Sequence, residues 1–399
     1  MAIYLDHAAS TPLLPEVLEA YAEALRTIGN PSSIHGHGQR AKQALEESRE
    51  RLAAVVGCEP VEVIFTSGGT ESINSAIKGL FWAARAADPV RSSVVIPGGE
   101  HHATADTVDW LVRAEGARRV EVPLDADGRI LPDRLAAALD SGSGAGSVAL
   151  TSAIWVNNEV GTIQPVAALA EVAAARSIPL HVDAVAALGH VPVDFARSGA
   201  SAMSLSAHKI GGPVSIGALV LGRRSSLVPL LHGGGQQRSV RSGTQDVAGA
   251  VAFALAAEVA TARLDDDVRR MGELRDRLVG GVRAAVDGSV MRGPAPGPER
   301  VTSNANITFA GCDGDSLLFA LDMAGISVST GSACTAGVPE VSHVLLDMGV
   351  PEDEARGALR FTLGPSTTQA DIDAVLAALP AAVERARAAG HSSREPAMY

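Results

Sequence analysis

The middle of the chain alternates between short apolar segments and amphipathic ones, and this alternation restricts the possible folds more than any other feature. VEVIFTS at residues 61–67 predicts a buried strand, and GGTES turns from it into a helix. Another strand is predicted at 93–99, and strands and helices continue to alternate beyond it. Such alternation indicates an α/β fold, in which helices cover both faces of a mainly parallel central sheet.

At 399 residues, the chain is longer than chains that fold around a single hydrophobic core usually are. A charged amphipathic pattern from about residue 260 to about residue 286 leads into the proline- and glycine-rich RGPAPGPER, and a separate apolar pattern follows. We predict a large domain at 15–258 and a smaller α+β domain at 259–388, which residues 1–14 join. Residues 389–399 are predicted to form a flexible tail.

Composition argues against several classes of protein. The chain is 46% hydrophobic and 20% charged, which is typical of a globular protein, and no segment approaches the roughly 20 apolar residues of a membrane helix. A net charge of -12 argues against direct nucleic-acid binding. The three cysteines lack paired spacing and the N-terminus does not resemble a leader, so we expect a reducing, cytoplasmic location.

The histidines do not suggest a metal site. His101 and His102 are adjacent, and His35 and His37 are two apart in a glycine-bearing loop. Neither pair has the context of a zinc finger or a His-Glu-x-x-His helix, so no metal is predicted.

One of only three lysines lies in SLSAHKIGGP, residues 204–213, in a chain that has thirty arginines. A lysine amine can condense with an aldehyde to form a Schiff base, whereas the arginine guanidinium cannot. Lys209 follows a predicted strand, so Ser206 and His208 could approach the phosphate of a cofactor whose aldehyde meets this amine. An ordinary surface lysine is the alternative interpretation.

Ten motifs extend this observation over nearly the whole chain. They are, in order, YLDHAAST, NPSSIHGHG, FTSGGTESIN, EHHA, VNNEVGTIQP, HVDA, SAHKIGGP, HGGGQQRSVRSGT, STGSACT and RFTLG. In this order they resemble the cysteine desulfurases of the NifS-like type, pyridoxal-phosphate enzymes of the class V aminotransferase superfamily. The resemblance implies the fold of the type I pyridoxal-phosphate transferases, with pyridoxal 5'-phosphate as the cofactor.

The motifs suggest separate cofactor contacts. The turn into a helix at Gly69 and Thr70 can hold a phosphate, although an N-cap by Thr70 would explain the same residues. Asp183 ends a predicted strand, where it can pair with a pyridine nitrogen or simply cap a loop. The resemblance makes His101 the residue that stacks on the ring and takes part in acid-base steps. It also places Asn158 beside the phenolic oxygen.

The resemblance also assigns the substrate side of the site. Cys334 in STGSACTAG would accept sulfur, and its small, polar neighbours suit a thiol that must move. Arg360 would bind the substrate carboxylate with Asn158 nearby, since a planar fork matches that group. Cys58 and Cys312 lack such surroundings and are predicted to be bystanders.

The implied reaction converts L-cysteine to L-alanine and leaves a persulfide on Cys334 for a sulfur-acceptor protein of unknown identity. Thr244 would reach a phosphate across a subunit interface, which implies a homodimer. A selenocysteine lyase or another pyridoxal-phosphate-dependent β-eliminating lyase is an alternative within the same fold. A catalytically silent sulfur-relay or scaffold protein is an alternative of another class.

One position departs from the pattern of the family. Many relatives carry a glutamine three residues after the aspartate, where it contacts the phenolic oxygen, whereas this chain has Ala186 there. The resemblance therefore implies that one hydrogen bond to the cofactor is missing.

Overall fold

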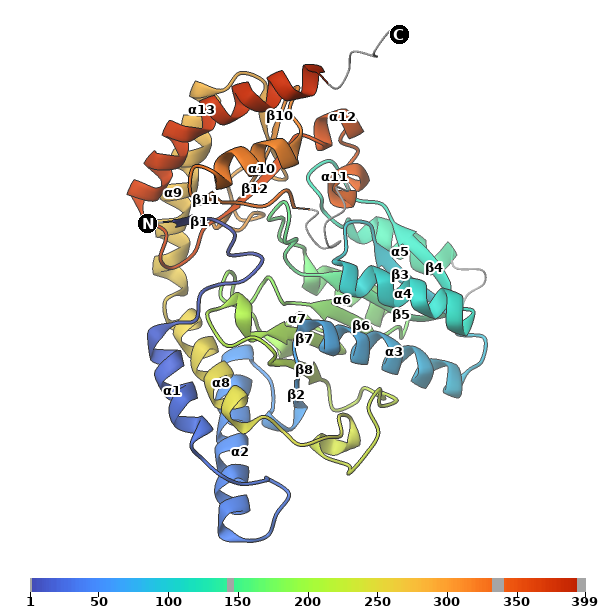
Figure 1. Ribbon diagram of the computed structural model, residues 1–399. Helices are drawn as coiled ribbons and strands as arrows, with labels where there is room; N and C mark the ends of the chain where they lie inside the picture. The colour runs from blue at the N-terminus through green and yellow to red at the C-terminus, as the bar shows by residue number, and fades with distance from the viewer. Residues whose placement is uncertain (1, 142–146, 332–340, 393–399) are drawn as a thin grey trace, which may run out of the picture.

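A seven-stranded sheet lies at the centre of the larger lobe in this computed structural model, which describes residues 2–141, 147–331 and 341–392 (Figure 1). The strand order is β2-β8-β7-β6-β5-β3-β4, and only β8 runs antiparallel to the others. The strands are β2 (Val63–Thr66), β3 (Ser93–Pro97), β4 (Arg118–Val122), β5 (Val148–Ile154), β6 (Leu180–Asp183), β7 (Ala202–Ser206) and β8 (Gly217–Leu221). The prediction of a mainly parallel α/β sheet is confirmed.

Helices cover both faces of this sheet, as expected when parallel strands are linked by helical crossovers. They are α1 (Pro15–Leu25), α2 (Gly36–Val56), α3 (Gly69–Ala87), α4 (His102–Glu115), α5 (Pro132–Ser141), α6 (Val166–Ala174), α7 (Phe195–Ser198) and α8 (Val247–Ala262). Short 3-10 helices occur at η1 (Pro60–Glu62), η2 (Ala207–Lys209) and η3 (Gln237–Ser239). Two clusters of buried apolar side chains fill the space between helices and sheet.

The smaller lobe has its own hydrophobic core. Its strands are β1 (Ile3–Tyr4), β9 (Ser289–Arg292), β10 (Asn304–Phe309), β11 (Ile326–Ser327) and β12 (Ala358–Thr362), and its helices are α9 (Leu264–Ala285), α10 (Gly314–Asp322), α11 (His343–Asp347), α12 (Glu352–Ala355) and α13 (Gln369–Ser392). Strands β12, β10 and β9 form an antiparallel sheet, while β1 pairs in parallel with β11. The N-terminal strand β1 thus packs with the C-terminal part of the chain (Figure 1).

Two boundaries differ in detail from the predictions. The helical pattern expected from about residue 260 is divided at Arg263, where α8 and α9 meet with a bend of 66°. We propose that the two lobes divide near this bend. The sequence predicts a flexible tail from residue 389, but helix α13 extends to Ser392, so residues 389–392 are helical. Residues 393–399 lie outside the described part of the chain.

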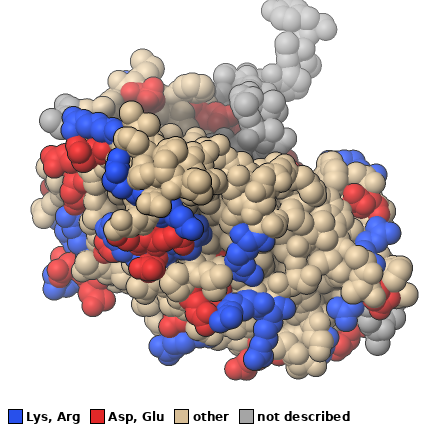
Figure 2. Space-filling model, turned by 90° about the horizontal axis from the view of Figure 1, so that it is seen from below, with Lys and Arg blue, Asp and Glu red and all other residues tan. Residues whose placement is uncertain are grey.

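No single described helix is long and apolar enough to cross a membrane, and only the bent pair α8 and α9 passes that test, by length and composition alone. Figure 2 shows acidic and basic side chains interspersed on the face seen from below. Because the two signs are mixed, this face has no large electrostatic potential of a single sign.

Candidate active site

A cavity of about 300 Å³ lies where the parallel strands β5, β6 and β7 end. Ligands of open α/β sheets bind beyond the carboxyl ends of the strands, so the topology itself selects this place. The cavity is lined by nearly all the predicted cofactor and substrate residues, namely Gly69, Thr70, His101, Asn158, Asp183, Ser206, His208, Lys209 and Arg360. The structure therefore brings together side chains that lie up to about 290 residues apart in the sequence.

Lys209 ends the short helix η2, which follows β7 directly. Its Nζ donates hydrogen bonds to the carbonyl oxygens of Ala8, at 2.5 Å, and Ala9, at 3.0 Å. The hydroxyl of Thr11 in turn donates to the backbone oxygen of Lys209 at 3.0 Å. The N-terminal segment therefore closes one side of the site and holds the amine inside the cavity.

The beginning of α3 forms the anion-binding end of the cavity. Gly68 occupies the N-cap position and no side chain caps the helix, so its first amides are available to a ligand. A side chain at Gly69 would place Cβ 2.8 Å from Cγ2 of Val185, which explains the glycine. Thr70 lies in the first turn and is not the N-cap. Ser206 is 1% exposed and its Oγ has no partner among the described residues, which suits a phosphate oxygen.

Asp183 lies at the floor of the cavity, at the end of β6. Its side chain is buried and accepts a hydrogen bond from the Val185 amide at 2.9 Å. Burial raises the pKa of Asp183 to about 6, against the opposing effects of the Val185 amide and the Lys209 charge. A cationic ring nitrogen would stabilise the ionised carboxylate at this place.

His101 is the N-cap of α4, and its Nδ1 accepts a hydrogen bond from the Ala103 amide at 3.0 Å. Burial, and then the positive charge of Lys209, lower the pKa of His101 to about 4, so the imidazole is neutral at pH 7. Because Nδ1 is an acceptor, the proton of the neutral ring lies on Nε2. His101 can therefore stack as a neutral ring and donate from Nε2.

Glu100, next to His101, is a buried acid that the sequence analysis quoted only as part of EHHA. Its Oε1 accepts a hydrogen bond from the Ile154 amide at 2.7 Å, and the residue is 2% exposed. Burial raises the pKa of Glu100 to about 8, and the nearby Asp183 acts in the same direction. This carboxyl group is protonated at pH 7 and adds no second negative charge beside Asp183.

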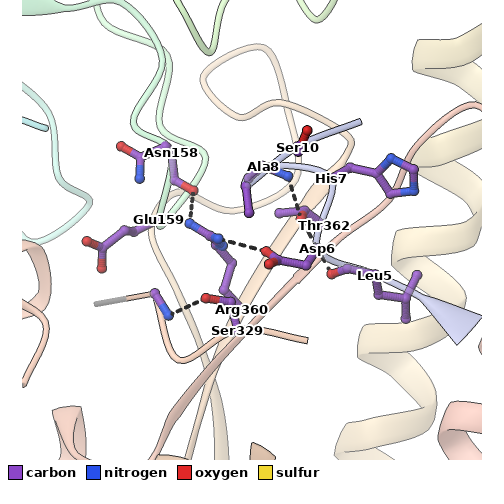
Figure 3. A network of polar contacts seen from close by, with 12 residues as sticks. Leu5, Asp6, His7, Ala8, Ser10, Asn158, Glu159, Ser329, Arg360 and Thr362 are labelled. Atoms are coloured by element: carbon purple, nitrogen blue, oxygen red, sulfur yellow. Dashed lines mark hydrogen bonds and ion pairs between the residues drawn. The ribbon is translucent and has the colours of Figure 1, made fainter. Parts of the chain in front are cut away.

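Arg360 extends from β12 into the opposite side of the cavity (Figure 3). Its Nη2 donates to Oδ1 of Asp6 at 2.8 Å, and its Nη1 donates to the backbone oxygen of Asn158 at 3.2 Å. Its Nε is buried and has no partner among the described residues. The guanidinium is thus fixed in direction and retains a donor for a carboxylate ligand.

Asp6 was not identified from the sequence as a site residue. The motif YLDHAAST contained it, but nothing local in that segment indicates that residue 6 meets residue 360.

One predicted residue does not line the cavity, and another lies outside the described part of the chain. Thr244 is exposed on the loop before α8, as a residue that serves another subunit would be. Cys334 lies outside the described residues, although Gly331, shortly before it, lines the cavity. Burial raises the pKa of Cys58 to about 12, which makes it a poor nucleophile and agrees with its interpretation as a bystander. The described residues contain no group of three potential metal ligands.

Comparison with known proteins places this arrangement in a family. The family model for class-V aminotransferases matches residues 3–375. The chain belongs to this class-V aminotransferase family. Among curated members, an IscS-like cysteine desulfurase of Mycobacterium tuberculosis is 52% identical over 386 residues, which cover 97% of each chain. A cysteine desulfurase of Cereibacter sphaeroides is 41% identical over 388 residues, 97% of each chain.

Solved structures of class-V aminotransferase relatives share the fold. A NifS-like protein superposes with a TM-score of 0.87 at 32% identity, over 96% of this chain and 100% of the other. A structure described as SspA in complex with cysteine gives a TM-score of 0.75 at 29% identity, over 92% of this chain and 100% of the other. The resemblance to NifS-like cysteine desulfurases and the fold class predicted from the sequence are confirmed.

The cofactor of this class-V family is pyridoxal 5'-phosphate, and the residues present fit it. An uncapped helix start and the unpartnered Ser206 hydroxyl suit its phosphate, and the buried Asp183 suits its ring nitrogen. Lys209 lies in the same cavity and supplies the amine that its aldehyde requires.

Proposed function

We propose that this protein is a pyridoxal-phosphate-dependent cysteine desulfurase, which converts L-cysteine to L-alanine and retains the sulfur as a persulfide on Cys334. The observation that carries the proposal is a single cavity of about 300 Å³ that contains Lys209, Asp183 and Arg360. These are an amine for the aldehyde, a carboxylate for the ring nitrogen and a guanidinium for the substrate carboxylate. The relatives named cysteine desulfurase and the cysteine-bound structure support the choice of substrate.

Different side chains carry out different parts of the reaction. When bound, pyridoxal phosphate supplies an electron sink that stabilises negative charge at the substrate's α-carbon. Arg360 binds the substrate carboxylate and is kept in direction by Asp6. Lys209 would hold the cofactor through its aldehyde, and its amine would remove the proton from the substrate's α-carbon. His101 is neutral, carries its one ring proton on Nε2 and lines the same cavity. It can therefore take part in proton transfer to or from the substrate thiol.

Cys334 completes the transfer. Its thiolate attacks the substrate sulfur, so a bond forms between the two sulfur atoms while the bond between sulfur and the β-carbon breaks. The electron pair of the broken bond passes to the carbon side, which takes up a proton and leaves as L-alanine. No external oxidant is needed, because the carbon is reduced as the two sulfur atoms are oxidised.

Three finer elements belong to this proposal. Thr244 lies exposed outside the cavity, which supports a homodimer in which it binds the phosphate of the neighbouring subunit. The persulfide is delivered to an acceptor protein. A thiol that carries sulfur in this way requires a reducing compartment, so we also propose a cytoplasmic location.

Incubation of the holoenzyme with limiting L-cysteine tests the proposal. We expect L-alanine and one added sulfur atom on Cys334 by peptide mass spectrometry, and neither product with Cys334→Ala. A selenocysteine lyase or another β-eliminating lyase would keep turning over cysteine in Cys334→Ala. Turnover of that kind would replace the desulfurase proposal with this alternative.

A further inference from the structure

A second, smaller cavity of about 30 Å³ lies directly against the candidate active site. The two cavities share Ala8, Asn158, Ala186 and Lys209 as lining residues. Ala186 carries only a methyl group at this shared wall. Polar residues surround much of the rest of the small cavity, namely His7, Asn157, His190, Ser303, Asn304 and Thr362.

His7 is the unusual member of this lining. It is 4% exposed, and neither Nδ1 nor Nε2 has a hydrogen-bond partner among the described residues. Buried polar groups are nearly always paired, so an imidazole with two unpaired nitrogens indicates a ligand. Burial, and then His190, lower the pKa of His7 to about 4, against the opposing effect of the nearby Tyr4 backbone. The Tyr4 contact does not have the geometry of a hydrogen bond, so the neutral ring still offers one donor and one acceptor.

The position of the His7 ring is set by its neighbours. The ring lies edge-on to Tyr4, with centroids 5.0 Å apart, and points away from the pair formed by Asp6 and Arg360 (Figure 3). A side chain at Gly364 would place Cβ 2.1 Å from Nδ1 of His7, so the glycine makes room for the ring. The ring is therefore held in a packed position, and the residue lines the small cavity.

The other polar groups of the small cavity are largely occupied. The Asn157 amide bonds to the backbone of Gly99, Glu159 and Val160, and the Asn304 amide bonds to the Glu159 oxygen. The Thr362 hydroxyl accepts from the Ala8 amide.

His190 is linked to Ser303 through Nδ1, at 3.2 Å, which leaves Nε2 for another partner. The lining thus offers unused hydrogen-bonding capacity at His7, at His190 and at the side-chain amide of Asn158, where the two cavities meet.

We propose that water occupies the small cavity and is held there by His7 and His190. This water passes the small side chain of Ala186 and hydrogen-bonds to the edge of the bound cofactor that lies beside Asn158. A buried water needs roughly 10–15 Å³ and two to four polar partners, and the cavity provides both. His7 is then a positioning residue that acts on the cofactor through water. This inference rests on the proposed function, because it requires the bound cofactor, and it takes from the family resemblance the placement of the phenolic oxygen beside Asn158.

The test compares two single variants of the holoenzyme with their combination. His7→Phe removes both ring nitrogens, and Ala186→Gln fills the small cavity with a side chain that displaces the water. The readouts are the visible absorption maximum of the bound cofactor at one fixed pH and its dissociation constant. We expect each single variant to move the absorption maximum, and His7→Phe to weaken cofactor binding by about two- to tenfold, the effect of one hydrogen bond.

The combination decides whether the two positions act through one water. With the cavity already filled by Ala186→Gln, His7→Phe should have no further effect on either readout, since coupled residues are not additive. His7→Asn, which keeps a donor and an acceptor, should restore most of the wild-type spectrum. Tyr4→Phe is the matched control, because Tyr4 packs on the His7 ring without lining the cavity, and its spectrum should equal that of the wild type.

Three results would overturn the inference. One is an unchanged spectrum in both single variants, and another is an equal effect of His7→Phe with and without Ala186→Gln. The third is a high-resolution structure of the holoenzyme without water at His7. All three leave the proposed function intact, provided that the wild-type protein shows the visible band of the bound cofactor. Absence of that band would contradict the proposed function as well.

Discussion

Arg360 and Asp6, 354 residues apart in the chain, form a buried ion pair with 2.8 Å between Nη2 and Oδ1. The side chain of Arg360 is 5% exposed and that of Asp6 20% exposed. The pair joins the N-terminal segment to β12 (Figure 3). Arg360 lines the same cavity as Lys209. The first residues of the chain therefore form one wall of the cavity, where we propose that the substrate binds.

Substitution Arg360→Lys should lower kcat/KM for L-cysteine about 100-fold, mainly through KM. A lysine cannot bond to Asp6, to the Asn158 oxygen and to a bidentate carboxylate at once. Steady-state kinetics check this, and the visible band of the cofactor should persist. Arg119→Lys, in a surface pair with Asp109, is the matched control and should match the wild type. Similar kcat/KM values for both variants would remove Arg360 from the substrate site.

Substitution His101→Phe should separate ring stacking from proton transfer. Phenylalanine keeps a flat ring against the cofactor but lacks Nε2, so kcat should fall about 10²- to 10⁴-fold while the cofactor stays bound. Loss of the cap on α4 should also cost about 1 kcal/mol of stability. The neighbouring His102→Phe should retain kcat. A His101→Phe enzyme of normal kcat would exclude a role in proton transfer.

Substitution Glu100→Gln should change how stability depends on pH. The native state keeps a proton on Glu100 up to a pKa of about 8, whereas the unfolded chain releases it near the ordinary value of 4.5. The unfolded state therefore binds fewer protons in this interval, and the contribution of Glu100 to stability falls as pH rises from about 4.5 to about 8. Glutamine never ionises, and its oxygen can still accept from the Ile154 amide.

Urea unfolding of the two holoenzymes from about pH 5 to about pH 8 measures this effect. The free energy of unfolding of Glu100→Gln minus that of the wild type should rise with pH, by up to roughly 4 kcal/mol. A difference that stays constant across the interval would mean that Glu100 is already ionised in the folded protein.

Mixed dimers test whether Thr244 serves the neighbouring subunit. Lys209→Ala should be inactive, and Thr244→Val should bind the cofactor weakly. A hybrid of the two contains one site with both Lys209 and the partner subunit's Thr244 intact, so it should recover about half of the wild-type activity. Hybrid activity no higher than that of the Thr244→Val dimer would show that Thr244 acts within its own subunit.

The sequence was sufficient to predict where those site residues lie that end a strand or follow one directly. Asp183 ends β6, and Ser206 ends β7 directly before Lys209, so a parallel sheet brings them to one edge regardless of loop detail. His101 follows β3 at the same edge. For these residues, local patterns and the topology of the fold together determine the position.

Contacts between distant segments could not be predicted in the same way. The roles of Asp6 and Ala8 depend on how the N-terminal segment packs against β12 and η2, and no local periodicity encodes that packing. The break at Arg263 is similar, because the residues around it continue a helical pattern although α8 and α9 meet there with a bend of 66°. The unpaired state of His7 also depends on groups that meet only in the folded chain.

The covalent state of Lys209 gives the most direct test of the account. Borohydride reduction of the active holoenzyme, followed by peptide mass spectrometry, should place a pyridoxyl group on Lys209 and on neither Lys42 nor Lys78. Lys209→Arg, which keeps the charge but cannot condense with an aldehyde, should carry no such group and have no turnover. An active protein with no adduct on Lys209, or with the adduct on another lysine, would contradict the account.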